Sequence, residues 1–464
     1  MKEKGFSVRT SRLGTTDLTV SRVGFGCYRV HEFEPDHREA LKSALLSGVN
    51  LIDTSTNYTD GSAERLVGDI TRELFDAEQL EREEIVIVTK VGYVQGTNLK
   101  EARERVSSGN PFPEMVEFQN DCWHNISPVF LENQITRSLE RLKMDTIDVL
   151  MLHNPEYYLK GGGSRDAYYA RIEKAFQHLE LEVDRGRIKS YGISSNTFPE
   201  PEARSDFTSL TRVFDIARQV SPKNHFAVIQ LPFNLYEAGA VLHKNNKRES
   251  AFDFAEEHGL GVLANRPFNA FGKDRLVRLT SYPTHDDVEV KGGLHTTLGR
   301  AIELEKRAPG SPKAPQGLQW AHALRDRLSE IDDLLVWRDA LFSQIYPSIR
   351  QALSRVSPDQ ASWVNDYQVA IQELLRLVTW DLENLANQKA NLIGEQLSGL
   401  APELASSPTL SRKVLRIYQS FPQLSSVLVG MRTPGYVADV LGTEAPLDKL
   451  KAEETLTRLQ RHRS

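Results

Sequence analysis

An aspartate, a tyrosine, a lysine and a histidine stand at or just beyond the ends of three apolar runs in the sequence. Asp53, Lys90 and His153 close these runs, and Tyr58 follows shortly after Asp53. A phenol is a weak acid, but a neighbouring ammonium stabilises the phenolate and would lower the pKa of the phenol. An aspartate would keep a buried lysine protonated, and an imidazole could hydrogen-bond a carbonyl oxygen. This combination predicts proton transfer to a carbonyl oxygen.

Each of these residues also has an ordinary structural explanation. Asp53 could cap a helix, Lys90 could lie at a rim, His153 could be a core histidine, and Tyr58 could pack in a loop. Other apolar runs, however, also end in polar residues: Ser194, Ser195, Gln230, Arg266 and Arg432. In a barrel of parallel strands the carboxyl ends converge on one pocket, which favours the functional interpretation.

Eight apolar runs of strand length recur along the chain. Their centres are Val23, Ile52, Ile87, Leu150, Ile193, Ile229, Leu263 and Val427. Most are rich in Val, Ile and Leu, as buried parallel strands are, and helical patterns such as residues 128–142 lie between them. The spacing predicts an α/β fold, a (β/α)8 TIM barrel. Residues 1–271 would hold the first seven strands, and residues 407–464 the last barrel helix, the eighth strand and a C-terminal helix.

Two gaps between the runs are too long for a regular barrel. Residues 91–126 are polar and punctuated by Gly and Pro, which predicts a long loop on the catalytic face. Residues 272–406 predict a large helical insertion between strand 7 and the last barrel helix, on the catalytic face, with amphipathic stripes at 324–335 and 364–385. The insertion could be a lid, a pocket wall or an oligomer or partner surface, or its helices could pack only on one another.

Composition narrows the class of protein. The 464 residues carry a net charge of −6, with 40% apolar and 26% charged residues, as in a globular protein. We expect no nucleic-acid partner without a basic stripe, no membrane span without a long apolar run, and no secretory signal. Cys27 and Cys122 form no disulfide framework, Cys27 reads as a buried filler, and no metal motif is present. A cytoplasmic protein with a small-molecule substrate is predicted.

Seven motifs resemble the aldo-keto reductase superfamily in order and spacing. They are GFG at 24–26, LIDTSTNY at 51–58, VTK at 88–90, DVLMLHNP at 148–155, YGISSN at 191–196, QLPFNL at 230–235 and VGMRTP at 429–434. The resemblance leaves out the segment after the third strand and the insertion.

The resemblance implies a barrel that binds NADPH or NADP+, with NAD less suited. Asp53, Tyr58, Lys90 and His153 match the catalytic tetrad of that family, and Tyr58 would be the general acid. The expected cofactor-binding residues are Ser194, Ser195, Asn196, Gln230, Arg266, Pro267, Phe268, Gly430 and Arg432. The expected substrate-binding residues are Tyr28, Trp123, Asn154 and Tyr157.

Three positions depart from the family pattern. Asn265 stands where many members have an aromatic residue that stacks on nicotinamide, and Val440 stands near a common adenine-binding Asn. Asn154 replaces an aromatic residue and predicts a more polar substrate pocket. Arg266 could bind the pyrophosphate or form a rim salt bridge, and Arg432 could bind a 2′-phosphate or be an ordinary surface arginine.

The sequence thus predicts an NADP-dependent oxidoreductase that interconverts an aldehyde, a ketone or a sugar carbonyl with its alcohol. The alternative is an NADPH-binding regulatory or scaffolding subunit with little turnover, whose insertion docks a partner. An oligomer formed through the insertion is compatible with both.

Overall fold

Eight parallel strands close into a barrel in the computed structural model, which describes residues 8–271, 276–308 and 318–461. In ring order the strands are β10 (Ile188–Ser194), β11 (Phe226–Pro232), β12 (Gly261–Asn265), β15 (Ser426–Val429), β3 (Val23–Gly26), β4 (Leu51–Asp53), β5 (Val86–Val91) and β9 (Ile147–His153). Each strand contains one of the eight predicted centres. The predicted (β/α)8 barrel is therefore confirmed.

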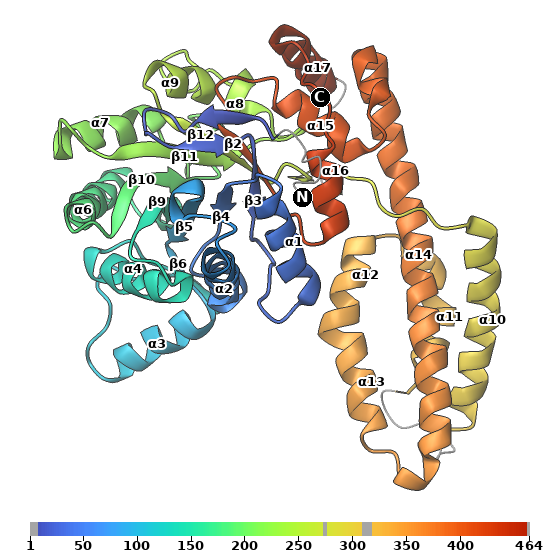
Figure 1. Cartoon of the computed structure of the whole chain (residues 1–464). Helices are drawn as coiled ribbons and strands as arrows, with labels where there is room; N and C mark the ends of the chain where they lie inside the picture. The colour runs from blue at the N-terminus through green and yellow to red at the C-terminus, as the bar shows by residue number, and fades with distance from the viewer. Residues whose placement is uncertain (1–7, 272–275, 309–317, 462–464) are drawn as a thin grey trace. The chain divides into compact units, whose positions relative to one another are not determined.

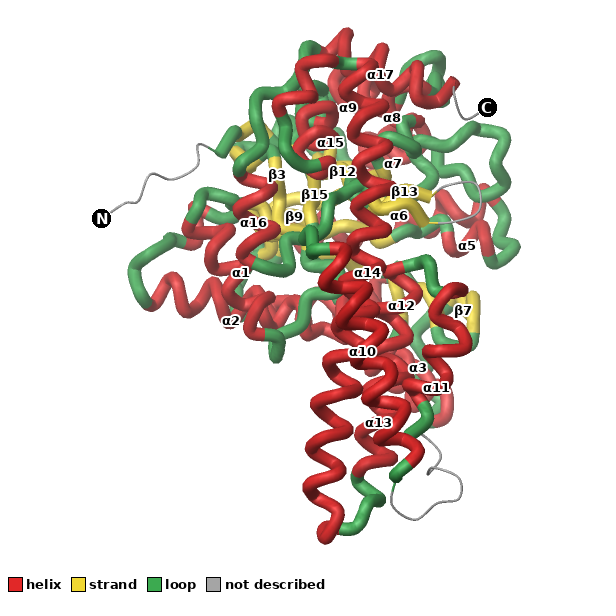
Figure 2. The backbone as a smooth tube through the Cα atoms, turned by 90° about the vertical axis from the view of Figure 1, so that its right-hand side faces the viewer, coloured by secondary structure: helices red, strands yellow, loops and turns green. Residues whose placement is uncertain are grey.

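Helices surround these strands on the outside of the barrel (Figures 1 and 2). One follows each strand in turn: α1 (Pro35–Leu46), α2 (Ser62–Asp76), α4 (Pro128–Leu142), α6 (Arg165–Asp184), α7 (Leu210–Val220), α9 (Ala251–Glu257), α15 (Leu410–Tyr418) and α16 (Pro434–Leu441). The short α5 (Tyr157–Lys160) and α8 (Gly239–Leu242) and the C-terminal α17 (Lys449–Arg461) are additional. Every residue of β5, β9 and β11 is buried, because the helices cover one face of the sheet and the barrel core covers the other.

An N-terminal hairpin covers the amino end of the barrel. It consists of β1 (Thr10–Arg12) and β2 (Thr19–Ser21), which pair antiparallel. Leu13 and Val20 from this hairpin join a buried cluster with Leu51 and Val86, the first residues of β4 and β5. The carboxyl ends of the strands, where the polar residues stand, are therefore on the side away from the hairpin.

The segment after the third barrel strand is folded, so the predicted long loop at 91–126 is wrong. It contains β6 (Tyr93–Val94), α3 (Gly96–Ser107), β7 (Val116–Gln119) and β8 (Cys122–His124), and the strands form a sheet in the order β6-β8-β7. The strands are too short to show a clear alternation, and α3 buries few apolar side chains. The predicted position is nevertheless right, because the Tyr93 ring centroid lies 4.6 Å from that of His153.

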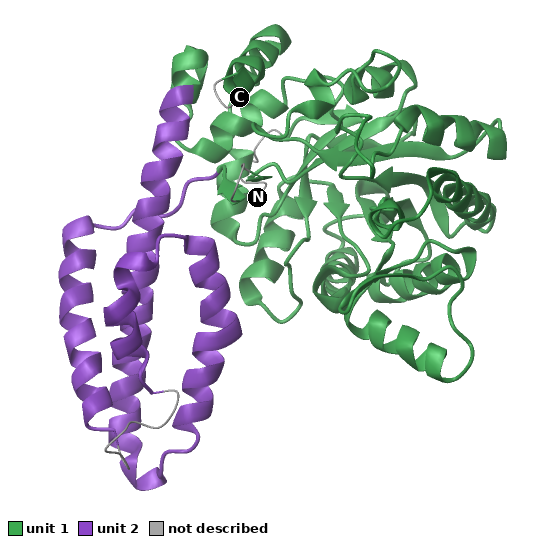
Figure 3. Ribbon diagram, turned by 180° about the vertical axis from the view of Figure 1, so that it is seen from behind, with its two compact units in different colours: residues 1–279, 397–464 green, residues 280–396 purple. Residues whose placement is uncertain are grey.

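Contacts divide the chain into two compact units, residues 1–279 with 397–464 (unit 1) and residues 280–396 (unit 2) (Figure 3). The predicted insertion, 272–406, extends beyond unit 2 at both ends, and its residues 272–275 lie outside the described residues. In the sequence, the antiparallel pair β13 (Asn269–Phe271) and β14 (Leu276–Arg278) precedes unit 2.

Unit 2 is helical and has its own apolar core. Its helices are α10 (Asp287–Lys306), α11 (Trp320–Arg327), α12 (Leu334–Ala340), α13 (Tyr346–Leu353) and α14 (Ala361–Leu400), the last of which continues into unit 1. The stripe at 364–385 lies on α14 as predicted. The stripe at 324–335 is not one helix, because Ile331 is extended and Asp333 caps a new helix by accepting from the N–H groups of Leu335 and Val336. Within the described ranges, no helix is long and apolar enough to cross a membrane.

A glycine in β10 allows β11 to approach closely. A Cβ atom added to Gly192 would lie 1.9 Å from the carbonyl oxygen of Val228. We expect Gly192→Ala to destabilise unit 1 by about 3 kcal/mol, because the backbone must move to accept the methyl group. Urea unfolding would measure the loss. Gly435→Ala is the control, since its nearest neighbour is Thr433 Oγ1 at 3.8 Å; equal unfolding midpoints for the two variants would contradict the prediction.

Candidate active site

The four residues predicted to act together lie together at the carboxyl ends of β4, β5 and β9. The Nζ atom of Lys90 donates to Asp53 Oδ2 at 2.8 Å, to the Thr54 carbonyl oxygen at 2.8 Å and to Tyr58 Oη at 3.3 Å. The ring centroids of Tyr58 and His153 are 6.0 Å apart. The Lys90 side chain is fully buried, so its charge is neutralised within the barrel and not by solvent.

A strained turn places Tyr58 above the end of β4. Thr59, Asp60 and Gly61 have φ values of 46°, 56° and 79°, and the first two are residue types that rarely adopt this left-handed region. The turn is tied down at both residues, because Thr59 Oγ1 donates to the Val30 carbonyl at 2.6 Å and Asp60 Oδ1 accepts from Thr97 N at 2.9 Å. These bonds offset the cost of the backbone conformation.

Burial controls the protonation of this cluster. It raises the pKa of Asp53 and lowers the pKa of Lys90, while the charge of each partner opposes the shift of the other. Burial, together with the negative charge of Asp53, also raises the pKa of Tyr58 well above its usual value. The expectation that Lys90 lowers this pKa is therefore wrong for the site as it stands. Tyr58 keeps its proton at neutral pH.

His153 is a neutral imidazole held from two sides. Burial lowers its pKa well below the usual value, and the charge of Lys90 adds to this shift. Its Nδ1 lies 3.0 Å from Ser55 Oγ, and its carbonyl oxygen lies 2.8 Å from His124 Nε2. Tyr93 packs edge-on against the His153 ring. Ser55, Tyr93 and His124 were not among the predicted site residues.

The residues expected to hold the nicotinamide carboxamide adjoin the tetrad. Strand register places Ser194 beside both His153 and Gln230. Gln230 Nε2 donates to Asp53 Oδ1 at 2.7 Å, and its Oε1 accepts from Ser194 Oγ at 3.0 Å and from Asn265 Nδ2 at 3.4 Å. The tetrad and this amide cluster are thus one hydrogen-bonded network.

Asn265 supplies the observation that tests the fit of a nicotinamide cofactor. Its Oδ1 is buried and has no hydrogen-bond partner in the described part of the chain. An acceptor without a donor beside the hydroxyl of Ser194 suits a ligand with a primary amide, which both donates and accepts. The residues fit the carboxamide of nicotinamide. The departure from the family pattern at Asn265 was the signal that could have placed this residue in the site.

Arg266 forms the rim salt bridge that the sequence left open as one of its two roles. Its guanidinium lies 3.3 Å from Glu237 Oε1 and donates to Asn196 Oδ1 at 3.1 Å. The φ of Arg266 is 55°, so its backbone is held in an unusual conformation beside Asn265. Arg266 and Asn196 are brought together, whereas contact with a pyrophosphate stays a prediction.

The remaining predicted cofactor residues have different surroundings. Ser195 Oγ is buried 3.1 Å from Thr197 Oγ1. The Pro267 carbonyl accepts from the Tyr418 hydroxyl, and Phe268 is half-buried. A Cβ at Gly430 would have no atom within 4 Å, so the backbone there is open to a ligand. Arg432 is half-exposed two residues further on.

Three of the four predicted substrate residues border the tetrad. Tyr28 is 56% exposed, with its ring centroid 5.4 Å from that of Tyr58. Asn154 Nδ2 donates to the Tyr93 hydroxyl at 2.8 Å, and the Tyr157 ring packs edge-on against Tyr93. Trp123 is buried and instead packs under Arg103 of α3.

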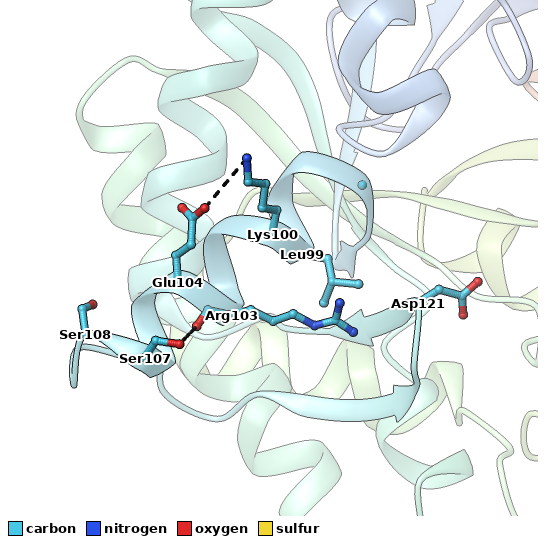
Figure 4. A pocket seen from close by; sticks show the side chains of 8 residues that line it. Leu99, Lys100, Arg103, Glu104, Ser107, Ser108 and Asp121 are labelled. Carbon is cyan, nitrogen blue, oxygen red and sulfur yellow. Dashed lines mark hydrogen bonds and ion pairs between the residues drawn. The ribbon is translucent and has the colours of Figure 1, made fainter.

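A surface cavity of about 640 Å³ lies along α3 (Figure 4). Its lining residues are Gly96, Leu99, Lys100, Arg103, Glu104, Ser107, Ser108 and Asp121. None of the tetrad residues lines it, and we assign it no role. Among the residues that the structure describes, no group of three or more His, Cys, Asp or Glu side chains is arranged to hold a metal ion.

Comparison with known proteins identifies the class. The model of the aldo/keto reductase family matches residues 22–321, and the chain belongs to this family. Like the family as a whole, it is an oxidoreductase that works with a nicotinamide cofactor.

Individual relatives match less closely. The uncharacterized oxidoreductase YqkF of Bacillus subtilis is 28% identical over 56% of this chain and 65% of its own length. The NADH-specific methylglyoxal reductase of Escherichia coli is 32% identical over 39% of this chain and 51% of its own. The chain thus spans about half to two thirds of these relatives. The solved structure of aldo-keto reductase AKR11C1 from Bacillus halodurans has a TM-score of 0.50 and 16% identity, covers 98% of this chain and 100% of its own, and shares the fold.

A buried carboxyl group beside the candidate cofactor site predicts pH-dependent stability. Glu156 is fully buried, its Oε1 accepts from Asn196 N at 2.9 Å, and burial raises its pKa from 4.5 to about 7. The folded chain therefore binds this proton more tightly than the unfolded chain does. The contribution to stability is complete below about pH 4.5 and is lost as the pH rises through about 7, by about 3 kcal/mol.

Glu156→Gln should remove this dependence and make the protein more stable than the parent chain at pH 8. Thermal unfolding of both proteins between pH 5 and 8, near Asp and Glu titration and above it, measures the difference. Parallel curves for the two proteins would show that Glu156 does not titrate in this range.

Proposed function

We propose that the protein is an NADP-dependent aldo-keto reductase that interconverts a small polar aldehyde or ketone with its alcohol. The observation that supports this most directly is the position of Lys90 Nζ between Asp53 Oδ2 and Tyr58 Oη, with a neutral His153 beside them. No structural requirement of the barrel calls for a buried ammonium next to a phenol, so a catalytic role explains it best.

The direction of the hydrogen bonds prepares Tyr58 to donate a proton. Lys90 has only donors, so in their contact it donates to Tyr58 Oη and leaves the phenol hydrogen for another acceptor. The raised pKa keeps that hydrogen in place at neutral pH. An oxygen that becomes alkoxide-like, with a conjugate acid comparable to water at about 15.7, is basic enough to take it. The adjacent ammonium then stabilises the phenolate that is left.

The amide cluster would hold the cofactor. When bound, nicotinamide supplies the hydride that reduces the carbonyl carbon. Ser194, Gln230 and Asn265 have the donors and acceptors for its carboxamide, and the link from Gln230 to Asp53 sets the ring near the tetrad. Arg266 with Asn196 suits the pyrophosphate, and Arg432 suits a 2′-phosphate.

A polar substrate fits the surroundings of the tetrad. The Asn154 amide, the hydroxyls of Tyr93 and Tyr157, and the exposed Tyr28 ring offer hydrogen bonds and one apolar face. Relatives whose names specify methylglyoxal, L-galactose and 6-dehydroglucose as substrates are in keeping with a small hydroxylated carbonyl.

Unit 1 would carry the chemistry. Every residue predicted for catalysis, cofactor binding or substrate binding lies in residues 1–279 or 397–464. The roles open for the helical insertion, including an oligomer or partner surface, stay proposals.

Removal of the Tyr58 hydroxyl tests the catalytic role. Tyr58→Phe should lower kcat at least about 100-fold, because it removes the general acid. The dissociation constant of NADPH, measured by fluorescence titration, should stay within about twofold, which corresponds to about 0.4 kcal/mol.

Tyr168→Phe is the control, since it removes a buried tyrosine hydroxyl that contacts Thr208 on the far side of α6 from this proposal. Unchanged turnover in Tyr58→Phe would reject the assigned role. If the parent chain binds NADPH tightly but turns over no aldehyde, ketone or alcohol of a broad panel, the regulatory or scaffolding function is favoured instead.

Selectivity between NADPH and NADH tests Arg432. The methylglyoxal reductase relative is NADH-specific, so selectivity must be measured in this chain. Arg432→Gln should weaken NADPH binding about tenfold or more and leave NADH binding nearly unchanged, because only the former carries a 2′-phosphate. Arg458→Gln, a surface arginine paired with Glu454, is the control. Equal weakening for both cofactors would contradict the assignment.

A further inference from the structure

Ser55 lies against the catalytic histidine in a position that the proposed mechanism does not use. Its Oγ is 3.0 Å from His153 Nδ1, and both side chains are buried. A neutral imidazole has one N–H donor and one bare nitrogen, and the partner of one nitrogen decides which is which. The hydrogen bonds of Ser55 therefore determine what the other nitrogen, Nε2, can do.

Two acceptors compete for the single hydrogen of the Ser55 hydroxyl. Asn57 Oδ1 lies 2.7 Å from Ser55 Oγ, and the Lys90 carbonyl oxygen lies 3.3 Å away. Both are oxygens that cannot donate. If Ser55 donates to either of them, its lone pair is left for a donor, and the nitrogen of His153 is the group in reach that can supply one.

The amide of Asn57 is itself held in this orientation. Its Nδ2 donates to Gln95 Oε1 at 2.9 Å, so its oxygen faces Ser55. Gln95 precedes α3 and also hydrogen-bonds the Cys122 side chain on β8. The chain of donors therefore runs in one direction, from His153 through Ser55 and Asn57 to Gln95, and ends on the folded segment after β5.

We infer that Ser55 is a positioning residue that fixes His153 in the tautomer with the proton on Nδ1, so that Nε2 is a hydrogen-bond acceptor. Asn57 and Gln95 set the direction of the bond. The backbone of His153 is fixed as well, since its carbonyl accepts from His124 Nε2 and a Cβ at Gly92 would lie only 2.5 Å from that oxygen.

This tautomer names a class of substrate, an inference that rests on the proposed function. A bare Nε2 cannot donate to a carbonyl oxygen, but it can accept from a hydroxyl group. Tyr58 would then donate to the carbonyl oxygen while His153 accepts from a hydroxyl on the neighbouring carbon. The site prefers α-hydroxycarbonyl compounds, and a carbonyl without that hydroxyl leaves Nε2 unpaired.

Nitrogen NMR of the full chain tests the tautomer without any turnover. Two-bond ¹H–¹⁵N correlations in protein labelled at histidine show which ring nitrogen carries the proton, and His153→Asn assigns the signal by its loss. We expect the proton on Nδ1. A proton on Nε2 would overturn the inference, whether or not the protein is an active reductase.

Substitution of Ser55 tests its positioning role. Ser55→Ala should release the tautomer preference in the NMR spectrum and raise KM for hydroxyacetone about tenfold, the effect of one lost hydrogen bond, while KM for acetone stays the same. Asn57→Asp keeps an acceptor for Ser55 and should keep the proton on Nδ1. It serves as the second variant if Ser55→Ala does not fold.

Ser62→Ala is the matched control, because its buried hydroxyl accepts from Glu32 N and not from the imidazole. It should leave the tautomer and both KM values unchanged. An unaltered His153 spectrum in Ser55→Ala, or an equal rise of KM for both ketones, would overturn the role of Ser55. Absence of turnover in the parent chain would instead count against the proposed function, and the spectra would still decide the tautomer.

Discussion

The arrangement of the site depends on one constraint, the burial of the Lys90 ammonium. A charge without access to water must find its partners within the protein, and removal of one partner of such a pair typically costs about 3–5 kcal/mol. Asp53 and the Thr54 carbonyl meet this requirement from β4 and its end, and Tyr58 is the third acceptor. The lysine thus holds the end of β4 and the phenol in one place, and the strained turn after Tyr58 is tolerated because of these bonds.

Gln230 extends this constraint to the opposite side of the barrel. It donates to the second oxygen of Asp53 and accepts from Ser194 and Asn265. The groups that suit a carboxamide are therefore connected to the groups that neutralise the lysine. Any change in how Gln230 is hydrogen-bonded alters the number of donors on Asp53 and, through it, the field felt by Lys90 and Tyr58.

The barrel and the tetrad could be predicted from the sequence because both leave local signals. Buried parallel strands read as runs of Val, Ile and Leu, and polar residues at their ends stand out against these runs. The segment after β5 gave no such signal, since its strands are short and α3 is mostly polar. The rise in the pKa of Tyr58 could not be foreseen either, because it depends on burial and on how far Asp53 already offsets Lys90. The partners of Asn265 likewise follow from tertiary contacts alone.

The left-handed turn at 59–61 has a consequence for attempts to improve the protein. Glycine adopts such angles without strain, so selection for heat tolerance would be drawn toward Thr59 and Asp60. Their side chains, however, anchor the turn to the Val30 carbonyl and to Thr97. A more durable variant obtained there would hold its phenol less firmly, and ruggedness would be exchanged for catalytic precision.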